Sequence, residues 1–380
     1  MSINSYFNDF LSNIRLTPDQ VSSLKTGHTT LRNRLNADPD LSAIVISTFL
    51  QGSYRRATAV RPQGEKRADV DIIVVTNLNR NSITPHDAID KFVPFVERHY
   101  KGKYEIQGRS IGIELSYVDL DIVITSAPSE ETKAILKSVS VTTEQNLEEL
   151  NDDWKLVTQW DKIQGRGMLN EAVRNAAEWK TEPLFIPDRD ANTWEQTHPL
   201  EQIRWTRDKN KNTNKHYINV VKALKWWRIL KLTDLQYPKG YPIEHMIGDC
   251  CPDNIVSVSQ GVCMTLEKIV SEYKIERTFN TTPTLPDRGV PEHNVWKRIS
   301  AKEFATFYDH VVHYAKIARE AMDATSLKTQ VEKWQELFGS KFPSYDGDDD
   351  SGSNLNNSNG PTGGFTQRNN PSTISGGRFA

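Results

Sequence analysis

Two neighbouring stretches decide how this chain folds: Phe49-Leu-Gln-Gly-Ser-Tyr54 and, after fourteen intervening residues, Asp69-Val-Asp-Ile-Ile-Val-Val75. The apolar run after Asp71 is typical of a strand that is buried on both faces. Because side chains alternate along a strand, Asp69 and Asp71 point to the same face. Two adjacent carboxylates repel each other, and a bound divalent cation relieves that repulsion. The sequence therefore predicts a Mg²⁺ site on this strand.

A third carboxylate is expected from a later strand, Tyr117-Val-Asp-Leu-Asp-Ile-Val-Ile124, where Asp119 and Asp121 again share a face. Three acids allow two metal ions, which activate an attacking oxygen and stabilise a leaving one. The first stretch also contains Gly52-Ser53. A glycine after a strand lets backbone N–H groups approach a phosphate, and the serine hydroxyl adds a donor.

Each of these signals is weak when taken alone, since an isolated Asp-x-Asp is most often a solvated edge or turn. Their order is more specific: a strand, Gly-Ser, a strand with Asp-x-Asp, and then a later strand with acids. This order favours an active metal site. The alternative is a set of solvated acids or a site that has lost its chemistry.

The run FLQGSYRRATAVRP, followed by ADVDIIVV, resembles the signature of polymerase-β-type nucleotidyltransferases. More narrowly, the chain is similar to the bacterial cGAS/DncV-like nucleotidyltransferases, the CD-NTases of anti-phage signalling. The narrower resemblance covers roughly Ile44 to Ala321 and is also carried by four later stretches, which are Val221-Lys-Ala-Leu-Lys-Trp-Trp-Arg228, Lys239-Gly-Tyr-Pro-Ile-Glu244, Trp194–Pro199 and Pro286–Pro291.

The resemblance implies a set of site residues. Those expected to bind the nucleotide are Gln51, Gly52, Ser53, Lys225 and Tyr241, and those expected to hold two Mg²⁺ ions, with Mn²⁺ as a substitute, are Asp69, Asp71 and Asp121. Asp121 is preferred to Asp119 because the family's third acid precedes an apolar pair. The alternative for Lys225 is a surface lysine beside a buried tryptophan, and for Tyr241 an aromatic residue that flanks a helix.

The resemblance also implies an activity, which is synthesis of a cyclic di- or trinucleotide second messenger from ATP, with GTP as a second substrate. The product would activate a separate effector protein. The alternatives are a linear oligoadenylate synthetase, a nucleotidyltransferase acting on RNA, a drug or a protein, and a degenerate enzyme that binds nucleotide without chemistry. A formally neutral folded body counts against long RNA substrates.

The expected fold class is α+β with two lobes. Residues 1–130 should form a polymerase-β-like catalytic lobe, a mixed sheet with N-terminal and flanking helices, and residues 131–343 a mostly helical nucleotide-binding lobe. Strand patterns end near Ser129, and helical patterns follow. The helices predicted there are Thr132–Val139, Asn146–Gln164, Met168–Trp179, His216–Leu232, Val262–Tyr273, Ala301–Met322 and Leu327–Phe338.

Residues 344–380 are rich in Gly, Asn and Ser and predict a disordered tail. The tail ends Gly376-Gly-Arg-Phe-Ala380. The family resemblance suggests that a ubiquitin-transfer-like ligase could conjugate this carboxyl terminus. The alternative is a tail with no role.

Composition excludes several classes. Lys plus Arg total 47 and Asp plus Glu total 49, so the net charge of −2 argues against a protein that coats nucleic acid. The N-terminus lacks the features of a signal peptide, and no apolar stretch is long enough to span a bilayer, so a cytoplasmic enzyme is expected. Four side chains raise the question of zinc, namely His245, Cys250, Cys251 and Cys263. Buried small hydrophobes are the favoured interpretation of these cysteines.

Overall fold

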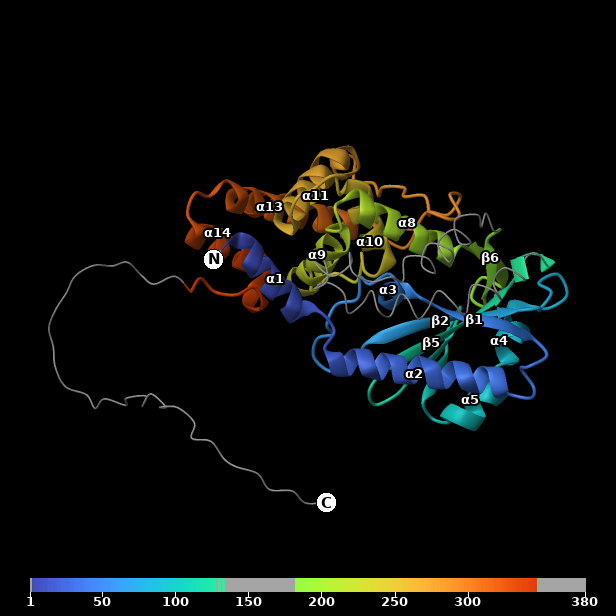
Figure 1. Ribbon diagram of the computed structural model, residues 1–380. Coiled ribbons are helices and arrows are strands. Elements are labelled where there is room, and N and C mark those ends of the chain that lie inside the picture. The colour runs from blue at the N-terminus through green and yellow to red at the C-terminus, as the bar shows by residue number, and fades with distance from the viewer. Residues whose placement is uncertain (1, 128, 131, 134–181, 347–380) are drawn as a thin grey trace, which may run out of the picture. The chain divides into compact units, whose positions relative to one another are not determined.

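The computed structural model describes residues 2–127, 129–130, 132–133 and 182–346 (Figure 1). The helices predicted within residues 134–181 and the predicted tail from residue 347 onward lie outside this range. Residues 1–345 belong to one compact unit. Within the described ranges, no helix combines the length and the apolar character that a membrane span needs.

A mixed β-sheet forms the part of the molecule that carries the predicted acids. The strands of the described residues are β1 (Val45–Gln51), β2 (Asp69–Thr76), β3 (Tyr104–Ile106), β4 (Ile111–Glu114), β5 (Asp119–Ser126), β6 (Leu184–Asp188) and β7 (Thr193–Thr197). Their order is β1-β2-β5-β4-β3, with β6 paired to the end of β5 and β7 paired to β6. Strands β2 and β5 are parallel, and the other pairs are antiparallel. This sheet and its helices confirm the predicted fold class.

The apolar run of β2 places it in the middle of the sheet. Ile72 and Val74 pack on one face, and Ile73 and Val75 pack on the other. A parallel strand buried on both faces needs such a continuous aliphatic run. The charged residues of β2 are therefore confined to its beginning, at Asp69 and Asp71.

One face of the sheet is covered by α2 (Pro18–Ala37), which lies across it in Figure 1. Thr17 begins this helix with a reciprocal capping box, in which it exchanges hydrogen bonds with Gln20. Leu24, Leu31 and other apolar residues of α2 share a buried cluster with β2 and β5. Helices α4 (Pro85–Asp90) and α5 (Val93–Tyr100) contribute to the same cluster.

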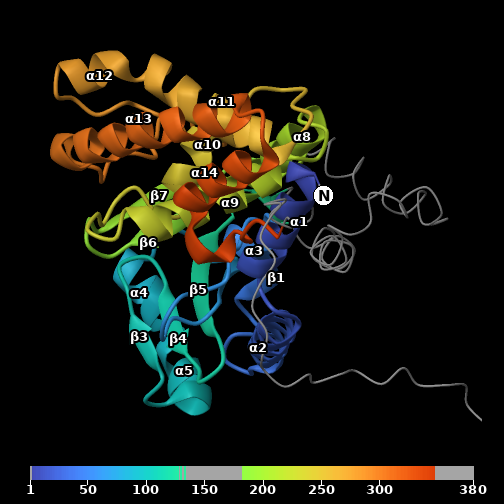
Figure 2. The same cartoon turned by 90° about the vertical axis from the view of Figure 1, so that its left-hand side faces the viewer.

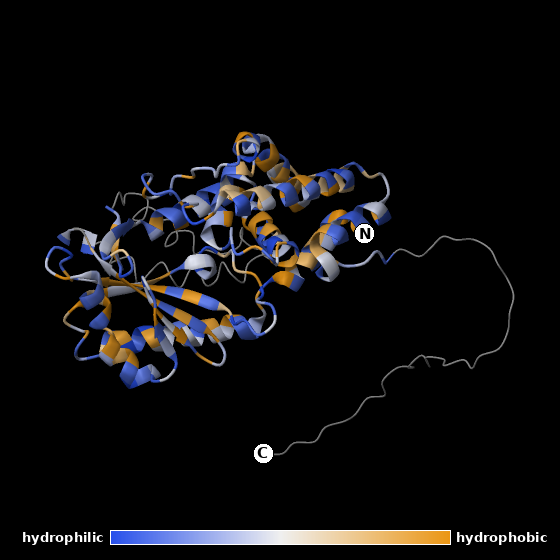
Figure 3. Ribbon diagram, turned by 180° about the vertical axis from the view of Figure 1, so that it is seen from behind, coloured by the Kyte–Doolittle hydropathy of each residue, from blue (hydrophilic) through white to orange (hydrophobic). Residues whose placement is uncertain are grey.

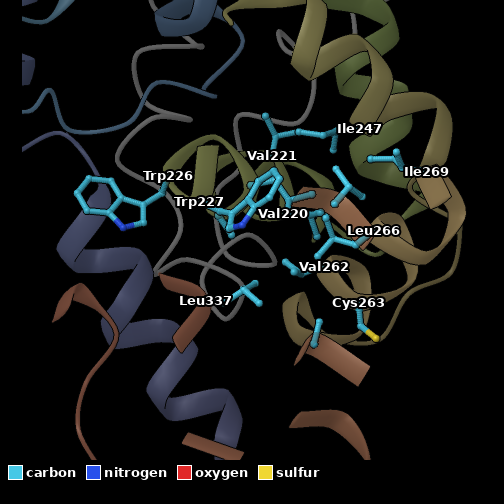
Figure 4. Packing of buried hydrophobic residues seen from close by; sticks show 14 of the residues in the cluster. Val220, Val221, Trp226, Trp227, Ile247, Val262, Cys263, Leu266, Ile269 and Leu337 are labelled. Atoms are coloured by element: carbon cyan, nitrogen blue, oxygen red, sulfur yellow. The ribbon is translucent and has the colours of Figure 1, made fainter. Parts of the chain in front are cut away.

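A second, larger hydrophobic cluster lies within the helices. The helices that contribute to it are α1 (Ile3–Ile14), α8 (Pro199–Asn212), α9 (Tyr217–Lys231), α10 (Tyr241–Cys250), α11 (Val258–Glu272), α13 (Ala301–Asp323) and α14 (Leu327–Phe338). The short helix α12 (Lys274–Thr278) and a 3₁₀ turn at Gly339–Lys341 add no residue to the cluster. Helix α9 is central, and Figure 4 shows Trp227 and Val220 packing toward Leu266 of α11. The hydropathy colours of Figure 3 show the same pattern, with apolar segments on the inner faces of the helices.

Helix α1 joins the helical cluster and not the core of the sheet. Phe7 packs edge-on against Trp334 at 5.0 Å, and Phe10 stacks on Phe338 at 4.4 Å between ring centroids. Figure 2 shows α1 beside α9 and α14. The first helix in the sequence is thus structurally part of the helical region, because its aromatic face matches the aromatic residues of α14.

The expectation that strands end near Ser129 is wrong. Strands β6 and β7 form a hairpin, and β6 joins the sheet through the pair Ser126 and Phe185. The hairpin escaped the pattern analysis because Pro187 interrupts β6 and because β7 is half-buried without regular alternation. A proline is tolerated in a strand at the edge of a sheet, where a backbone donor is not needed.

Candidate active site

The predicted acids lie in register on adjacent strands. In the parallel pair of β2 and β5, Asp71 is opposite Asp121 and Asp69 is opposite Asp119. On the other side of β2, Gln51 at the end of β1 is opposite Asp71. The fold thus brings the predicted metal-binding acids and the predicted phosphate-binding segment to one end of the sheet.

Gly52 is required by a close approach to Asp71. Its φ of +79° lies in the left-handed region that favours glycine, and an added Cβ would stand 1.8 Å from the Oδ2 atom of Asp71. Ser53 follows in the short helix α3 (Gly52–Arg55), and its carbonyl accepts hydrogen bonds from the N–H groups of Thr58 (2.9 Å) and Ala59 (3.1 Å). The segment after Ser53 therefore folds back on it and fixes its backbone.

The buried carboxylates of the site raise one another's pKa values. Burial, with added repulsion from Asp69 and Asp121, raises the pKa of Asp71 to about 7. Burial, with repulsion from Asp69 and Asp119, raises the pKa of Asp121 to about 6. Arg56 works against the rise at Asp71 without cancelling it. The site thus carries more negative charge than its surroundings balance.

This donor set fits Mg²⁺. It offers only hard oxygen ligands, and a divalent cation would supply the positive charge that the acids lack. In the described residues, no three His, Cys, Asp or Glu side chains already stand in a metal-binding arrangement. Asp69, Asp71 and Asp121 would therefore have to turn their carboxylates toward one another when an ion binds.

Asp119 and Asp121 differ in their ion-pair partners. Arg67 Nε donates to Asp119 Oδ1 at 2.6 Å, and the same guanidinium binds Glu114 at 3.1 Å. Asp121 has no ion-pair partner among the described residues. Asp119 is thus engaged by an arginine, whereas Asp121 is not, and the preference for Asp121 as the third metal-binding acid stays a prediction.

Lys225 is held in a buried ion pair. Its Nζ donates to Glu244 Oε1 at 2.7 Å. The other oxygen of Glu244 accepts from Thr58 Oγ1 at 2.9 Å and from Arg56 Nε at 3.2 Å. Although burial alone would raise it, the pKa of Glu244 is lowered because Lys225 and Arg56 stabilise the ionised carboxylate. One carboxylate thus joins α9 to the segment that folds back on Ser53.

The surroundings of Tyr241 limit its exposure. The Arg56 guanidinium lies over its ring at 5.1 Å, and His245 meets the ring edge-on at 5.6 Å. The Tyr241 hydroxyl is buried without a hydrogen-bond partner in the described structure. Arg56 covers one face of the ring, so a base would have to stack on the other face, and this role stays a prediction.

The four side chains considered for zinc do not gather. Cys250, Cys251 and Cys263 are buried free thiols, and His245 Nδ1 lies 3.2 Å from Asp249. Burial raises the pKa of Cys250 to about 12 and of Cys263 to about 11, which keeps these thiols protonated. In the part of the chain that the structure describes, these side chains form no group that could hold a metal ion.

Sequence reasoning missed Arg56 and Thr58 and assigned no role to Glu244. The pair Arg55-Arg56, which follows Gly-Ser after one tyrosine, was a usable signal, because basic residues near a phosphate-binding turn can contact the phosphate or its ligands. The partner of Arg56 could not be found in this way, because Glu244 lies 188 residues further along the chain.

Comparisons with known proteins agree with the nucleotidyltransferase site that the geometry suggests. A model for the "Second Messenger Oligonucleotide or Dinucleotide Synthetase domain" matches residues 1–150. The chain is 46% identical to a cyclic AMP-AMP-GMP synthase of Enterobacter hormaechei subsp. hoffmannii, over 90% of this chain and 92% of the relative. It is 28% identical to a cyclic AMP-AMP-AMP synthase of Acinetobacter sp., over 90% of this chain and 86% of the relative.

Among solved structures, the Vibrio cholerae cyclic AMP-GMP synthase DncV, in complex with a linear intermediate, shares the fold with a TM-score of 0.61 at 13% identity, over 90% of this chain and 96% of DncV. Asp69, Asp71, Asp121 and Gly52 lie within the residues that the family model matches. This chain therefore belongs to the bacterial cGAS/DncV-like nucleotidyltransferases (CD-NTases), and it is a cyclic oligonucleotide synthase.

Proposed function

We propose that this enzyme makes a cyclic trinucleotide from ATP, with GTP as a second substrate. The relative at 46% identity is named for a product with two adenines and one guanine, whereas the relative named for an all-adenine product is 28% identical. The observation that carries the catalytic part of the proposal is the row formed by Gln51, Asp71 and Asp121 across three adjacent strands, directly beside Gly52.

In the proposed reaction, Asp69, Asp71 and Asp121 would hold two Mg²⁺ ions, for which Mn²⁺ could substitute. When bound, the ions neutralise phosphate charge and lower the pKa of the attacking hydroxyl. Gly52 and Ser53 bind the donor triphosphate through backbone N–H groups and the serine hydroxyl. Lys225 faces the triphosphate from α9.

The 3′- or 2′-hydroxyl of one nucleotide attacks the α-phosphorus of the next, and the bond to pyrophosphate breaks as the new P–O bond forms. Asp121 would act on the side of the attacking hydroxyl, because it would bind the ion nearest to that hydroxyl. Two such transfers build a linear trimer, and a third closes the ring with loss of the last pyrophosphate.

Labelled ATP and GTP incubated with the purified chain and Mg²⁺ test this proposal. Phosphatase treatment followed by mass spectrometry should leave a resistant product with the mass of a cyclic trimer. A phosphatase-sensitive product would instead identify a linear oligonucleotide synthetase, and an absence of turnover would favour a nucleotide-binding protein. Asp69→Asn and Asp71→Asn variants should form no product in the same assay.

The cyclic product acts in the bacterial cytoplasm on a separate effector protein in anti-phage defence. Its chemistry supports this role, because a ring without terminal phosphates resists phosphatases and can diffuse to another protein. Phage challenge of cells carrying the operon with wild-type or Asp71→Asn enzyme tests the role. Equal protection by both would contradict it.

The carboxyl terminus Gly376-Gly-Arg-Phe-Ala380 is proposed to be conjugated by a ubiquitin-transfer-like ligase. The support is the sequence alone: a segment rich in Gly, Asn and Ser that ends in a small residue suits an enzyme that activates carboxyl termini. Deleting the last three residues should remove higher-mass adducts of the enzyme in cells. Adducts that persist after the deletion would contradict the proposal.

A further inference from the structure

The segment that follows Ser53 contains a strained residue. Ala57 has a φ of +58°, which lies in the left-handed region that a side chain disfavours. Such a conformation persists only where the surrounding contacts fix it. The contacts that this segment makes therefore decide how firmly the phosphate-binding turn at Gly52 and Ser53 is held.

The first anchor of this segment is Glu244 in α10. Thr58 is buried, and its Oγ1 donates to Glu244 Oε2 at 2.9 Å. The N–H groups of Thr58 and Ala59 donate to the Ser53 carbonyl at 2.9 and 3.1 Å. Glu244 thus holds the side of the segment that faces α9 and α10.

The second anchor is Arg61, which binds the carboxyl end of α1. Its N–H donates to the Ile14 carbonyl at 2.7 Å, and its Nε donates to the Arg15 carbonyl at 2.9 Å. Its Nη2 also lies 3.4 Å from the Ser12 carbonyl. The last turn of α1 contains no basic residue, so Arg61 supplies the cation that the free carbonyls of a helix end favour.

The helix that Arg61 binds is fixed in turn. Asn13 Nδ2 donates to the Lys341 carbonyl at 3.0 Å, and the aromatic residues of α1 pack on those of α14. The end of α1 thus gives Arg61 a firm point of attachment. Because only one residue separates Arg61 from Ala59, loss of this attachment would loosen the hydrogen bonds that fix the Ser53 carbonyl.

We propose that Arg61 is a positioning residue, which ties the segment behind Ser53 to α1 and thereby keeps the phosphate-binding turn in shape. This role deepens the proposed function and rests on it, since it takes Gly52 and Ser53 as the donors to the triphosphate. Such donors contact the triphosphate in the ground state and in the transition state alike. Their displacement should therefore raise KM and leave kcat nearly unchanged, whereas a residue that only stabilises the fold would leave KM unchanged.

Binding of α,β-methylene-ATP in the presence of Mg²⁺, measured by calorimetry on the full chain, tests this role without turnover. Arg61→Met should weaken binding about tenfold and raise KM for ATP by a similar factor, with kcat within about twofold of wild type. Arg61→Lys should recover most of the affinity, because an ammonium group also donates to carbonyls. Lys66→Met, which removes an exposed lysine of the same loop, is the matched control and should bind like wild type.

Hydrogen exchange of the nucleotide-free protein distinguishes positioning from a general loss of stability. In Arg61→Met, exchange should become faster in residues 54–61 and stay at the wild-type rate in β2 and β5. Faster exchange throughout the sheet would overturn the proposal, since it would mean that Arg61 stabilises the fold as a whole. Binding of the analogue equal to wild type would also overturn it.

Failure of the proposed function would give a different result. A wild-type enzyme that binds the analogue but forms no cyclic trinucleotide from ATP and GTP would refute the proposed product. Weaker binding of the analogue by Arg61→Met in that enzyme would still support the role of Arg61, because calorimetry and hydrogen exchange do not depend on turnover.

Discussion

Replacing Asp71 by asparagine should stabilise the metal-free protein while it abolishes activity. Burial and the facing carboxylates raise the pKa of Asp71 to about 7, whereas a free aspartate in an unfolded chain titrates at about 3.9. The folded state therefore prefers the protonated carboxyl. This contribution to stability is fully present below pH 4 and is lost as the pH rises through 7.

The size of the effect follows from the two pKa values. Ionisation of Asp71 at pH 8 costs the metal-free fold about 4 kcal/mol, and at pH 5 the cost falls to about 2 kcal/mol. These are upper bounds, since Asp69 and Asp121 titrate together with Asp71. Asparagine keeps the shape of the side chain without the charge. Asp71→Asn should thus gain up to about 4 kcal/mol at pH 8 relative to wild type.

Urea unfolding in EDTA at pH 5 and pH 8 measures this difference. Adding Mg²⁺ at pH 8 should stabilise wild type, because the ion binds the folded state, and should have little effect on Asp71→Asn. Asp323→Asn, at the exposed end of α13, is the control and should change stability by no more than about 0.5 kcal/mol. A metal-free Asp71→Asn protein that is less stable than wild type at pH 8 would refute the reasoning.

Four further substitutions test neighbouring parts of the site. Glu244→Gln leaves Lys225 without its counterion, so it should lower the free energy of unfolding by about 3 kcal/mol and raise KM for ATP. Urea unfolding and steady-state kinetics measure these two effects. Wild-type values for both would show that the ion pair is dispensable. Asp121→Asn should lower kcat at least about a thousandfold. Asp119→Asn should keep most of the activity, because the Asp119 carboxylate is already paired with Arg67. A larger loss of kcat in Asp119→Asn than in Asp121→Asn would exchange the roles of the two acids. Gly52→Ala should abolish product formation, because the new Cβ would overlap the carboxylate of the facing strand; an active alanine variant would mean that this turn moves freely.

The end of the sheet that carries the acids could be predicted because the residues that define it lie close together in the sequence. Asp69 and Asp71 are two residues apart on one strand, and Gly52 immediately follows another, so alternation and turn chemistry suffice to place them. The parallel pairing of β2 with β5 then needed only the assumption that two apolar strands with acids at the same end are neighbours. The register of Asp71 with Asp121 agrees with that assumption.

Contacts between distant segments could not be predicted. The aromatic face of α1 was readable from its helical spacing, but nothing in the residues themselves indicated that it packs on α14 and not on the sheet. The hairpin of β6 and β7 was missed for a related reason, since a single backbone pair to β5 gives it no continuous apolar pattern. In both cases the partner, and not the local sequence, determines the structure.

Asp71 and Glu244, the two buried acids of this site, show why sequence alone could not predict how each charge affects the stability of the fold. Asp71 faces other carboxylates, so its pKa rises and its charge destabilises the fold until a cation binds. Glu244 faces Lys225 and Arg56, so its pKa falls and its charge stabilises the fold. Neutralising the first should therefore raise stability and neutralising the second should lower it, although both remove one negative charge from a buried position. That opposition makes the pair of variants, Asp71→Asn and Glu244→Gln, a stricter test of the arrangement than either one alone, because a general effect of mutation in the core would move both in the same direction.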